Sequence, residues 1–319
     1  MNKFKRVLVN CYNSLYDVKV HIEESRKWQE DRKNQKKYGI PKIMTVDETL
    51  DVILNTGVSV CRYGDGEFKI MDGDSIQFQK DSEKLSERLK EVIQCNDENI
   101  LICIPGFIDR LHVKKIRLDD KNERIRHNQA LRYTNNILAE RRLKWYEYFD
   151  MSRTYGEACV SRFYASVYDD EKSIRWLKKW KQVWDGKNII IVEGELTRMG
   201  VGNDLFNNAK SIRRILAPAK SAFSSYNQIF DAVIKHHKAD ELVLIALGPT
   251  ATVLAYDLAK KGIRSIDIGH IDIEYEWMLR KDRTHQKIEG KFVSEAQDGN
   301  EVLLEVADER YINQVIERV

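Results

Sequence analysis

Short apolar runs alternate with amphipathic stretches along most of this chain. Short runs with the composition of β-strands occur at residues 58–61, 100–104, 158–164, 188–192, 212–216, 242–247 and 266–268. Helical periodicity fills the gaps, at residues 46–55, 82–94, 122–149, 171–184, 222–237 and 251–261. Several runs are apolar at successive positions, which is typical of parallel strands covered by helices on both faces. The pattern predicts an α/β fold, a Rossmann-like, doubly wound, mainly parallel sheet with helices on both faces.

Departures from this alternation predict the domain organisation. Residues 1–44 are basic and weakly amphipathic, so we expect an N-terminal helical segment there. Its densest charge, at residues 32–37, is typical of a solvated helix face and less often of a patch for anionic lipid headgroups. Residues 45–285 carry the alternation and form the predicted main domain, with a helical insertion at about residues 105–150. Residues 286–319 are predicted to be an accessory segment with a strand and a helix.

Composition narrows the class of protein. With 319 residues and 42% hydrophobic content, the chain is long enough for a large core. Its 53 basic and 50 acidic residues leave a net charge of only +3, so no global field recruits nucleic acid. Five cysteines without a C-x-x-C motif favour a reducing compartment, and seven histidines without ligand spacing predict no structural zinc. Without a signal-peptide core or an apolar run of about 20 residues, a cytoplasmic protein is expected.

The first stretch with chemical potential reads V-S-V-C-R-Y-G-D-G-E-F and begins at residue 58. A buried strand ends here in two carboxylates, Asp65 and Glu67, beside Gly64 and Gly66. Oxygen ligands on tightly bent backbone suit a hard divalent cation, Mg²⁺ or Mn²⁺, that keeps open positions for a substrate's phosphates. Arg62 would face the same phosphates. A plain surface turn uses the same residue types, and this alternative stays open.

A second stretch follows the run at residues 188–192. The guanidinium of Arg198 can donate two hydrogen bonds to one phosphate group, and Gly200 and Gly202 allow the backbone to approach a ligand closely. We expect a helix to begin near Asn203 and Asp204, with its free N–H groups facing the ligand. These features favour a diphosphate cradle, with a glycine-rich turn as the alternative.

A third stretch, Gly248, Pro249 and Thr250, follows the run at residues 242–247. Proline at the start of a helix, after a glycine, predicts a tight turn whose N-terminal amides face outward and attract anions. A purely architectural turn is equally compatible. Arg162, near the end of the run at residues 158–164, is a further candidate for the same rim.

The fourth stretch alternates polar and apolar residues from Asp267 to Trp277. If its backbone is extended, several of its polar groups share one face. His270 with Asp272 or Glu274 would then serve as a general base or its support, with a hydrogen-bonded packing pair as the alternative.

These motifs, taken together and in order, resemble a known family. R-Y-G-D-G-E-F, V-E-G-E-L-T-R-M-G-V-G-N-D-L-F, L-G-P-T-A-T-V-L-A and D-I-G-H-I-D-I-E-Y-E-W are similar to motifs of the GT-D glycosyltransferases, over about residues 45–285. The resemblance implies a Rossmann-like domain whose D-x-E motif, here Asp65 and Glu67, holds a divalent metal against a nucleotide-sugar diphosphate. It also implies the family's activity, glucosyl transfer from UDP-glucose to a growing glycan on a bacterial surface adhesin.

The expected function is therefore metal-dependent transfer of a hexose from a UDP-sugar to a glycan or a glycosylated protein or lipid, in surface polysaccharide or glycoprotein synthesis. Candidates for the base that accepts the acceptor's proton are His270, Asp272, Glu274 and Glu195. A metal-dependent phosphohydrolase and a non-catalytic nucleotide-binding partner of a glycan-assembly complex are the alternatives. Association with the inner face of the membrane and a homo-oligomer are left open by the sequence.

Overall fold

The structure, a computed structural model, describes residues 36–77, 79–80, 82–106, 144–296, 298–299 and 308–319, together with residues 29, 33, 134, 141 and 302. The chain divides into two compact units, Met1–Lys42 with Phe107–Arg153 and Ile43–Gly106 with Thr154–Val319. Most of the predicted N-terminal segment and of the predicted insertion, including the helix expected at residues 122–149, lies outside the described residues. All of the predicted site residues belong to the second unit.

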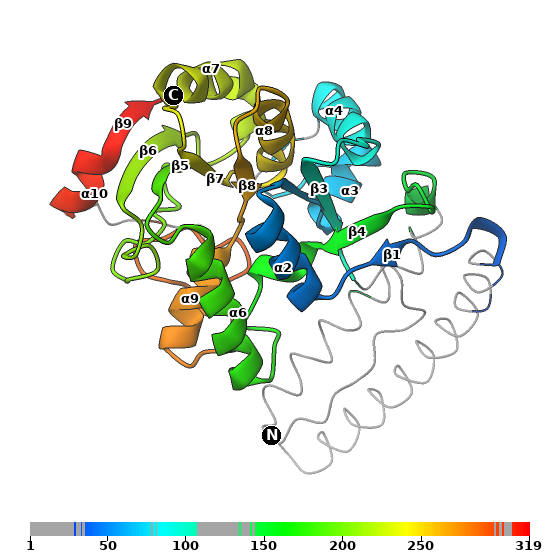
Figure 1. Ribbon diagram of the computed structural model, residues 1–319, viewed down its shortest axis with the longest axis horizontal. Coiled ribbons are helices and arrows are strands. Elements are labelled where there is room, and N and C mark those ends of the chain that lie inside the picture. Colours follow the sequence, from blue (N-terminus) through cyan, green and yellow to red (C-terminus); the bar gives the residue numbers. More distant parts are fainter. Residues whose placement is uncertain are drawn as a thin grey trace, which may run out of the picture. The chain divides into compact units, whose positions relative to one another are not determined.

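One sheet organises the second unit. Nine strands of the described residues form it, in the order β1-β4-β3-β2-β8-β7-β5-β6-β9 (Figure 1). Every pairing from β4 to β9 is parallel, which confirms the predicted α/β class. The strands are β1 (Lys42–Ile43), β2 (Ser59–Arg62), β3 (Ile100–Ile104), β4 (Thr154–Glu157), β5 (Asn188–Gly194), β6 (Ser211–Ala217), β7 (Leu242–Ala246), β8 (Ser265–Asp267) and β9 (Val315–Arg318).

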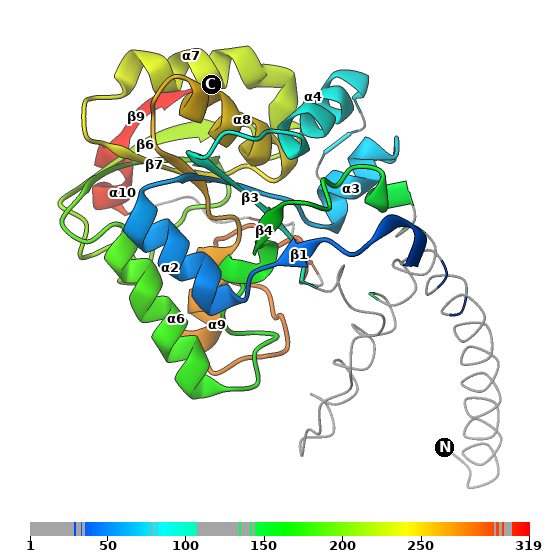
Figure 2. The same ribbon diagram turned by 45° about the vertical axis from the view of Figure 1, so that its right-hand side comes forward.

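Helices cover both faces of the sheet, because its central strands are apolar at successive positions and need cover on each side. In two views, α4, α7 and α8 lie on one face, and α2, α6 and α9 lie on the other (Figures 1 and 2). Strands β3 and β7 are buried along their whole length. The helices are α2 (Val46–Thr56), α3 (Asp65–Met71), α4 (Glu83–Ile93), α6 (Asp170–Val183), α7 (Tyr226–His236), α8 (Pro249–Lys260), α9 (Ile271–Leu279) and α10 (Glu309–Gln314), with 3₁₀ turns η1 (Ala158–Ser161) and η2 (Ala222–Ser225).

Local signals explain where several helices begin. Thr45 and Glu48 form a capping box at the start of α2, in which the Glu48 amide donates to Thr45 Oγ1 at 3.2 Å and the Thr45 amide to Glu48 Oε2 at 2.7 Å. Helix α8 starts at Pro249, as predicted. None of the helices among the described residues is long and apolar enough to cross a membrane.

Two predictions of local structure, directly after strands β4 and β5, are wrong. The run at residues 158–164 was expected to be a strand, but β4 ends at Glu157 and a 3₁₀ turn follows. The Glu157 carboxylate terminates the strand, because it accepts from the amides of Gly106 and Cys159, each at 3.0 Å. The helix expected near Asn203 is also absent, since residues 201–210 form turns that lead directly into β6. Gly200 and Gly202 have positive φ values of 74° and 79° there, which interrupts helical backbone.

Close packing between β3 and β4 makes Gly156 a sensitive position. A Cβ atom at Gly156 would lie 2.5 Å from Cys103 Sγ and 3.2 Å from Leu101 Cδ2. Gly156→Ala should therefore lower the free energy of unfolding by about 1–3 kcal/mol, as overpacking of a buried site does. The measurement is chemical denaturation.

Gly57→Asn is the matched control. Gly57 ends α2 in left-handed backbone, which asparagine tolerates, and nothing lies within 4 Å of a Cβ there. A change within about 0.5 kcal/mol is expected for this surface position. Equal unfolding free energies for the two variants would contradict the packing described for β3 and β4.

Candidate glycosyl-transfer site

The predicted residues gather where parallel strands end. Strand β2 is followed by α3 and α4, and α4 lies on one face of the sheet, whereas β8 is followed by α9 on the other face (Figure 2). Strands β2 and β8 are neighbours, with Val60 opposite Ile266. Loops that leave adjacent strands toward opposite faces open a crevice between them, the usual ligand position in open α/β sheets.

Arg62 lies at the base of this crevice and binds three elements together. Its Nε donates to the Asp267 carbonyl oxygen at 2.8 Å and one terminal nitrogen to Asp267 Oδ1 at 2.9 Å. The other terminal nitrogen donates to the Ala158 carbonyl oxygen at 3.0 Å and to Ser161 Oγ at 2.7 Å. A Cβ atom at Gly269 would lie 1.9 Å from this guanidinium, so only glycine fits there. Arg62, predicted to contact phosphate, is held as a clamp between β2, β8 and η1.

The two carboxylates of the D-x-E motif belong to the first turn of α3. Gly64 is the N-cap residue, and its amide donates to Glu67 Oε2 at 2.6 Å. Asp65 pairs with Lys69 Nζ at 2.8 Å, one helical turn on, and its side chain is 43% exposed. Gly66 packs closely, because a Cβ atom there would lie 3.3 Å from Ile76 Cδ1. The stretch is thus a helix start and not only a surface turn.

The electrostatics of Glu67 are compatible with a cation at this helix start. Burial is the main cause that raises the pKa of Glu67 to about 7, and the nearby charges of Asp267 and Asp65 act in the same direction. A divalent cation would relieve this repulsion. Among the described residues, no group of three His, Cys, Asp or Glu side chains could hold a metal. Asp65 and Glu67 fit a cation that completes its shell with water and substrate phosphates, as Mg²⁺ usually does.

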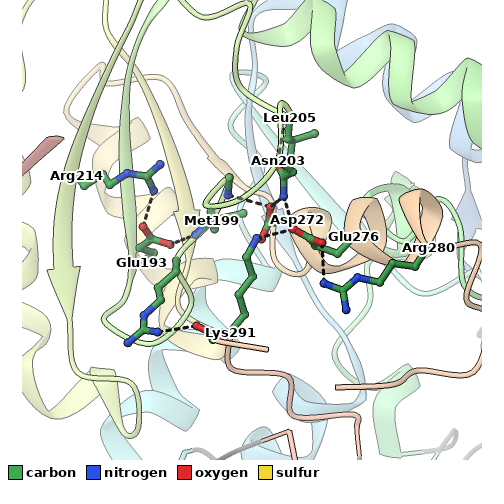
Figure 3. Close-up of polar contacts among 12 residues, drawn as sticks. Glu193, Met199, Asn203, Leu205, Arg214, Asp272, Glu276, Arg280 and Lys291 are labelled. Carbon is green, nitrogen blue, oxygen red and sulfur yellow. Dashed lines mark hydrogen bonds and ion pairs between the residues drawn. The ribbon is translucent and has the colours of Figure 1, made fainter. Parts of the chain in front are cut away.

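A buried polar network fixes the loop that follows β5 (Figure 3). Asp272 accepts from the Gly200 amide at 2.9 Å, from Asn203 Nδ2 at 2.8 Å and from Lys291 Nζ at 2.7 Å. Glu276 accepts from the same Asn203 nitrogen at 2.7 Å and the same Lys291 ammonium at 3.0 Å. Asp272, Glu276 and Lys291 are all buried, so these bonds are shielded from water.

The remaining predicted residues of this loop lie at its two ends. Arg198 has left-handed backbone with a φ of 52°, and its side chain is buried and donates to the Gly290 carbonyl oxygen at 2.8 Å. Asp204 accepts from the Tyr275 hydroxyl and lies 3.4 Å from Lys181 Nζ, near the surface. Arg198 is thus bound to the backbone at Gly290, and Asp204 to Tyr275 and Lys181.

Residues 271–279 are helical and not extended, which corrects the expected common face. Polar and apolar positions alternate there, but every residue from Ile271 to Trp277 is buried, so this part of α9 packs on every side. In a helix, Asp272 and Glu276 share a face, and Glu274 points the opposite way. Glu274 Oε2 accepts from the amides of Tyr164 and Ala165, at 2.8 and 2.7 Å.

The four candidate bases are consequently kept apart. Asp272 belongs to the network around Lys291, and Glu274 holds the chain after η1. His270, just before α9, lies beside Arg162 with its Nδ1 3.4 Å from a guanidinium nitrogen. Burial lowers the pKa of His270 to about 4, so the ring is neutral at neutral pH. Glu195 is exposed at the end of β5.

The structure adds site residues that sequence reasoning missed. Glu295 forms a bidentate pair with Arg162 and lies 3.7 Å from His270 Nδ1. Lys291 and Glu295 lie in irregular chain beyond residue 285, where no periodicity marks them. The role of Asp267 could have been predicted from the sequence, because an acid at the end of a buried strand needs a partner for its charge, such as Arg62.

The turn after β7 matches its prediction most closely. Gly248 has a φ of 54° and a ψ of −141°, and Pro249 begins α8. Thr250 is fully buried, and its hydroxyl has no hydrogen-bond partner among the described residues. Thr252 donates to the Arg62 carbonyl oxygen at 2.8 Å, which fixes the start of α8 beside the end of β2.

Comparison with known proteins identifies the family. The profile described as "Glycosyltransferase GT-D fold" matches residues 60–296. This chain belongs to the GT-D glycosyltransferase family. It is 39% identical over 236 residues to the "Probable glycosyl transferase Gly" of Streptococcus gordonii, covering 74% of this chain and 33% of that protein. It is 33% identical over 287 residues to "Glycosyltransferase GlyD" of Streptococcus pneumoniae, covering 89% of this chain and 33% of that protein.

Solved structures agree with this assignment. "A New Glycosyltransferase (DUF1792) from Streptococcus sanguinis" superimposes with a TM-score of 0.77 at 33% identity, over 88% of this chain and 99% of that one. A structure titled "The highly conserved domain of unknown function 1792 has a distinct glycosyltransferase fold" gives the same TM-score and identity, over 89% and 98%. The chain thus spans about a third of the length of the two streptococcal relatives named above, and nearly all of these solved domains.

The role of Asp272 is open to a stability test. Asp272→Asn removes one partner of a buried ion pair, which typically costs about 3–5 kcal/mol of unfolding free energy. Glu195→Gln, at an exposed position, should change it by no more than about 0.5 kcal/mol. The denaturation midpoints of both variants, compared with that of the parent, test this difference in stability. Unchanged stability of Asp272→Asn together with lost activity would favour a role as the base instead.

The pKa of Glu274 predicts a pH dependence of stability. Burial raises this pKa from 4.5 to about 7, so the folded protein holds the proton more tightly than the unfolded chain. The contribution of the Glu274 carboxyl to the free energy of unfolding is fully present below about pH 4.5 and is lost as the pH rises to about 7. In the parent, the free energy of unfolding should fall by about 3 kcal/mol between about pH 4.5 and pH 7 because of this group, since each pKa unit corresponds to about 1.4 kcal/mol. Glu274→Gln should abolish this part of the fall. The exposed variant Glu87→Gln should keep the parent's dependence of unfolding free energy on pH. If Glu274→Gln also kept the parent's dependence, the raised pKa of Glu274 would be contradicted.

Proposed function

We propose that this glycosyltransferase moves a hexose such as glucose from a UDP-sugar to a glycan acceptor, with Mn²⁺ or Mg²⁺ held by Asp65 and Glu67. The observation that carries the proposal is the first turn of α3, where a partly buried carboxyl, that of Glu67, has its pKa raised to about 7 beside other acids. Such a position at the carboxyl end of a central strand favours a cation and its phosphate ligand.

The reaction requires the nucleoside diphosphate to leave from the anomeric carbon of the sugar. A divalent cation, when bound, supplies positive charge that offsets the charge developing on the leaving phosphates. Helix α8, which begins at Pro249, would add free amides from the residues after this proline, and the buried Thr250 hydroxyl would add a donor. Gly248 leaves the backbone of this turn uncovered, so that phosphate oxygens can approach it closely.

The acceptor hydroxyl loses a proton during transfer. Asp272 and Glu274 each accept two or more N–H bonds from other segments of the chain, which gives both carboxylates a structural role. His270 and Glu195 are the candidates we favour. Of the two, His270 lies beside Arg162, at the start of α9 and next to the clamp around Arg62.

The biological setting is proposed from the relatives. Both streptococcal proteins are named as glycosyltransferases, and the resemblance described above associates the family with glycans on bacterial surface adhesins. We place the reaction in the cytoplasm, where UDP-sugars are made, with surface polysaccharide or glycoprotein synthesis as its destination.

Turnover of the donor tests the reaction class. The protein is incubated with a panel of UDP-, GDP- and dTDP-sugars and Mn²⁺, and released nucleotide is measured. Slow release of UDP from a UDP-hexose is expected even without acceptor. Release of inorganic phosphate from simple phosphate esters would favour a phosphohydrolase instead, and UDP binding without turnover even with cell-derived acceptors would indicate a non-catalytic partner.

Binding calorimetry tests the metal site itself. In the parent, Mn²⁺ should raise the affinity for UDP by at least about tenfold, equivalent to about 1.4 kcal/mol. Glu67→Gln and Asp65→Asn remove charge at nearly constant volume and should lose most of this enhancement while remaining folded. Exposed Glu87→Gln on α4 is the control and should keep it. Retention of the full Mn²⁺ effect in both site variants would place the metal elsewhere.

A further inference from the structure

A cavity of about 440 Å³ lies away from the crevice that holds the D-x-E carboxylates. Its walls are the loop after β5, the first half of β6 and helix α10. Ile212 and Arg214 line it, and both precede the carboxyl end of β6 at Ala217, so the cavity lies over the body of the strand. Gly200 and Gly202 also line it, whereas no residue of α3 or of the start of α8 does.

Arg214 is a buried cation that presents donors to this cavity. Its side chain is 3% exposed, and one terminal nitrogen donates to Glu193 Oε1 at 2.6 Å (Figure 3). Its Nε donates to Gln314 Oε1 at 2.8 Å. The second terminal nitrogen has no hydrogen-bond partner among the described residues, and a Cβ atom at Gly200 would lie 3.9 Å from it. The guanidinium is therefore fixed on two sides, with its remaining N–H groups available on the third.

Tyr311 provides a second unused group in the same wall. Arg214 lies over its ring, 4.7 Å from the centroid. The side chain is 3% exposed, yet its hydroxyl has no hydrogen-bond partner among the described residues. A buried hydroxyl without a partner costs stability, so its presence is explained if a ligand supplies the missing bond.

The charges around the cavity indicate the class of ligand. Its lining contains two cations, Arg214 and Arg310, and two carboxylates, Asp204 and Asp308. The Glu193 carboxylate behind Arg214 further offsets the positive charge, so no excess of cations selects phosphate. Donors and acceptors beside an aromatic ring, that of Phe206, suit a polyol, whose hydroxyls both donate and accept.

We propose that this cavity binds a saccharide unit of the acceptor glycan. The assignment to the acceptor rests on the proposed function, because a donor that occupies the crevice leaves the growing glycan as the second carbohydrate. The Tyr311 hydroxyl and the available Arg214 nitrogen bond sugar hydroxyl oxygens, and Asp308 accepts from sugar hydroxyls.

Tyr311→Phe tests the proposal, because it removes one hydroxyl and nothing else. Saturation-transfer NMR is recorded with maltotriose, methyl β-glucoside and methyl N-acetyl-β-glucosaminide as probes. At least one probe should bind the parent, and the variant should bind it roughly three- to tenfold more weakly, the effect of one hydrogen bond. Its melting temperature should be unchanged or higher, since the hydroxyl has no partner in the protein.

Tyr226→Phe is the matched control. The Tyr226 hydroxyl donates to Asp257, so its removal should lower the melting temperature and leave saccharide binding per folded molecule unchanged. If no probe binds the parent, or if Tyr311→Phe binds as tightly as the parent, the proposal is wrong.

UDP binding in the presence of Mn²⁺, measured on the same samples, separates this proposal from the proposed function. Tyr311→Phe should bind UDP as the parent does. If the parent binds a saccharide through Tyr311 but binds no nucleotide, the saccharide site stands and its assignment to a UDP-sugar acceptor falls. If UDP binds and no saccharide does, only the cavity proposal falls.

Discussion

The guanidinium of Arg62 is the contact on which the geometry of the crevice depends. It makes four hydrogen bonds, to the end of β8 and to η1, from the last residue of β2. Removing one partner of a buried pair such as Arg62 and Asp267 typically costs about 3–5 kcal/mol, so this clamp is a large share of a marginal stability. Because it fixes the end of β2, it also fixes where α3 begins and where its two carboxylates lie.

A second set of buried charges does the same for the other side of the crevice. Lys291 holds Asp272 and Glu276 on one face of α9, and Asp272 in turn holds the Gly200 amide. The glycine-rich loop is thereby fixed to a helix that follows β8, although 72 residues separate Gly200 from Asp272. Polar groups fixed before the ligand arrives need no reorganisation during the reaction, which is the basis of electrostatic catalysis.

The sequence predicts those parts of the fold in which the hydrophobic pattern has one clear periodicity, either helical or strand-like. The run at residues 100–104 is strand β3, and the capping box of Thr45 and Glu48 begins α2, because these signals act within a few residues. Helix α9 was misjudged for a physical reason: it is buried on all sides, so its polar positions mark ion-pair partners and not a solvent face. Its alternation also imitates a strand.

The candidate site was predictable as a set of loops but not as a set of contacts. Asp65, Glu67 and Gly248 could be found, because strand ends and helix starts leave local signals. The partners of Arg62 and Asp272 come from distant segments that only the fold brings together. Lys291 and Glu295 were beyond prediction, since irregular chain has no period from which a contact can be inferred.

In the function proposed above, Asp65 and Glu67 hold a metal against the diphosphate of the donor. A crystal grown with UDP and Mn²⁺ tests it most directly, through the anomalous signal of manganese. One manganese peak is expected, bonded to oxygens of Asp65, Glu67 and the diphosphate, with the phosphates near the start of α8. Ordered UDP with its phosphates away from α3, or manganese bound without either carboxylate, would contradict it.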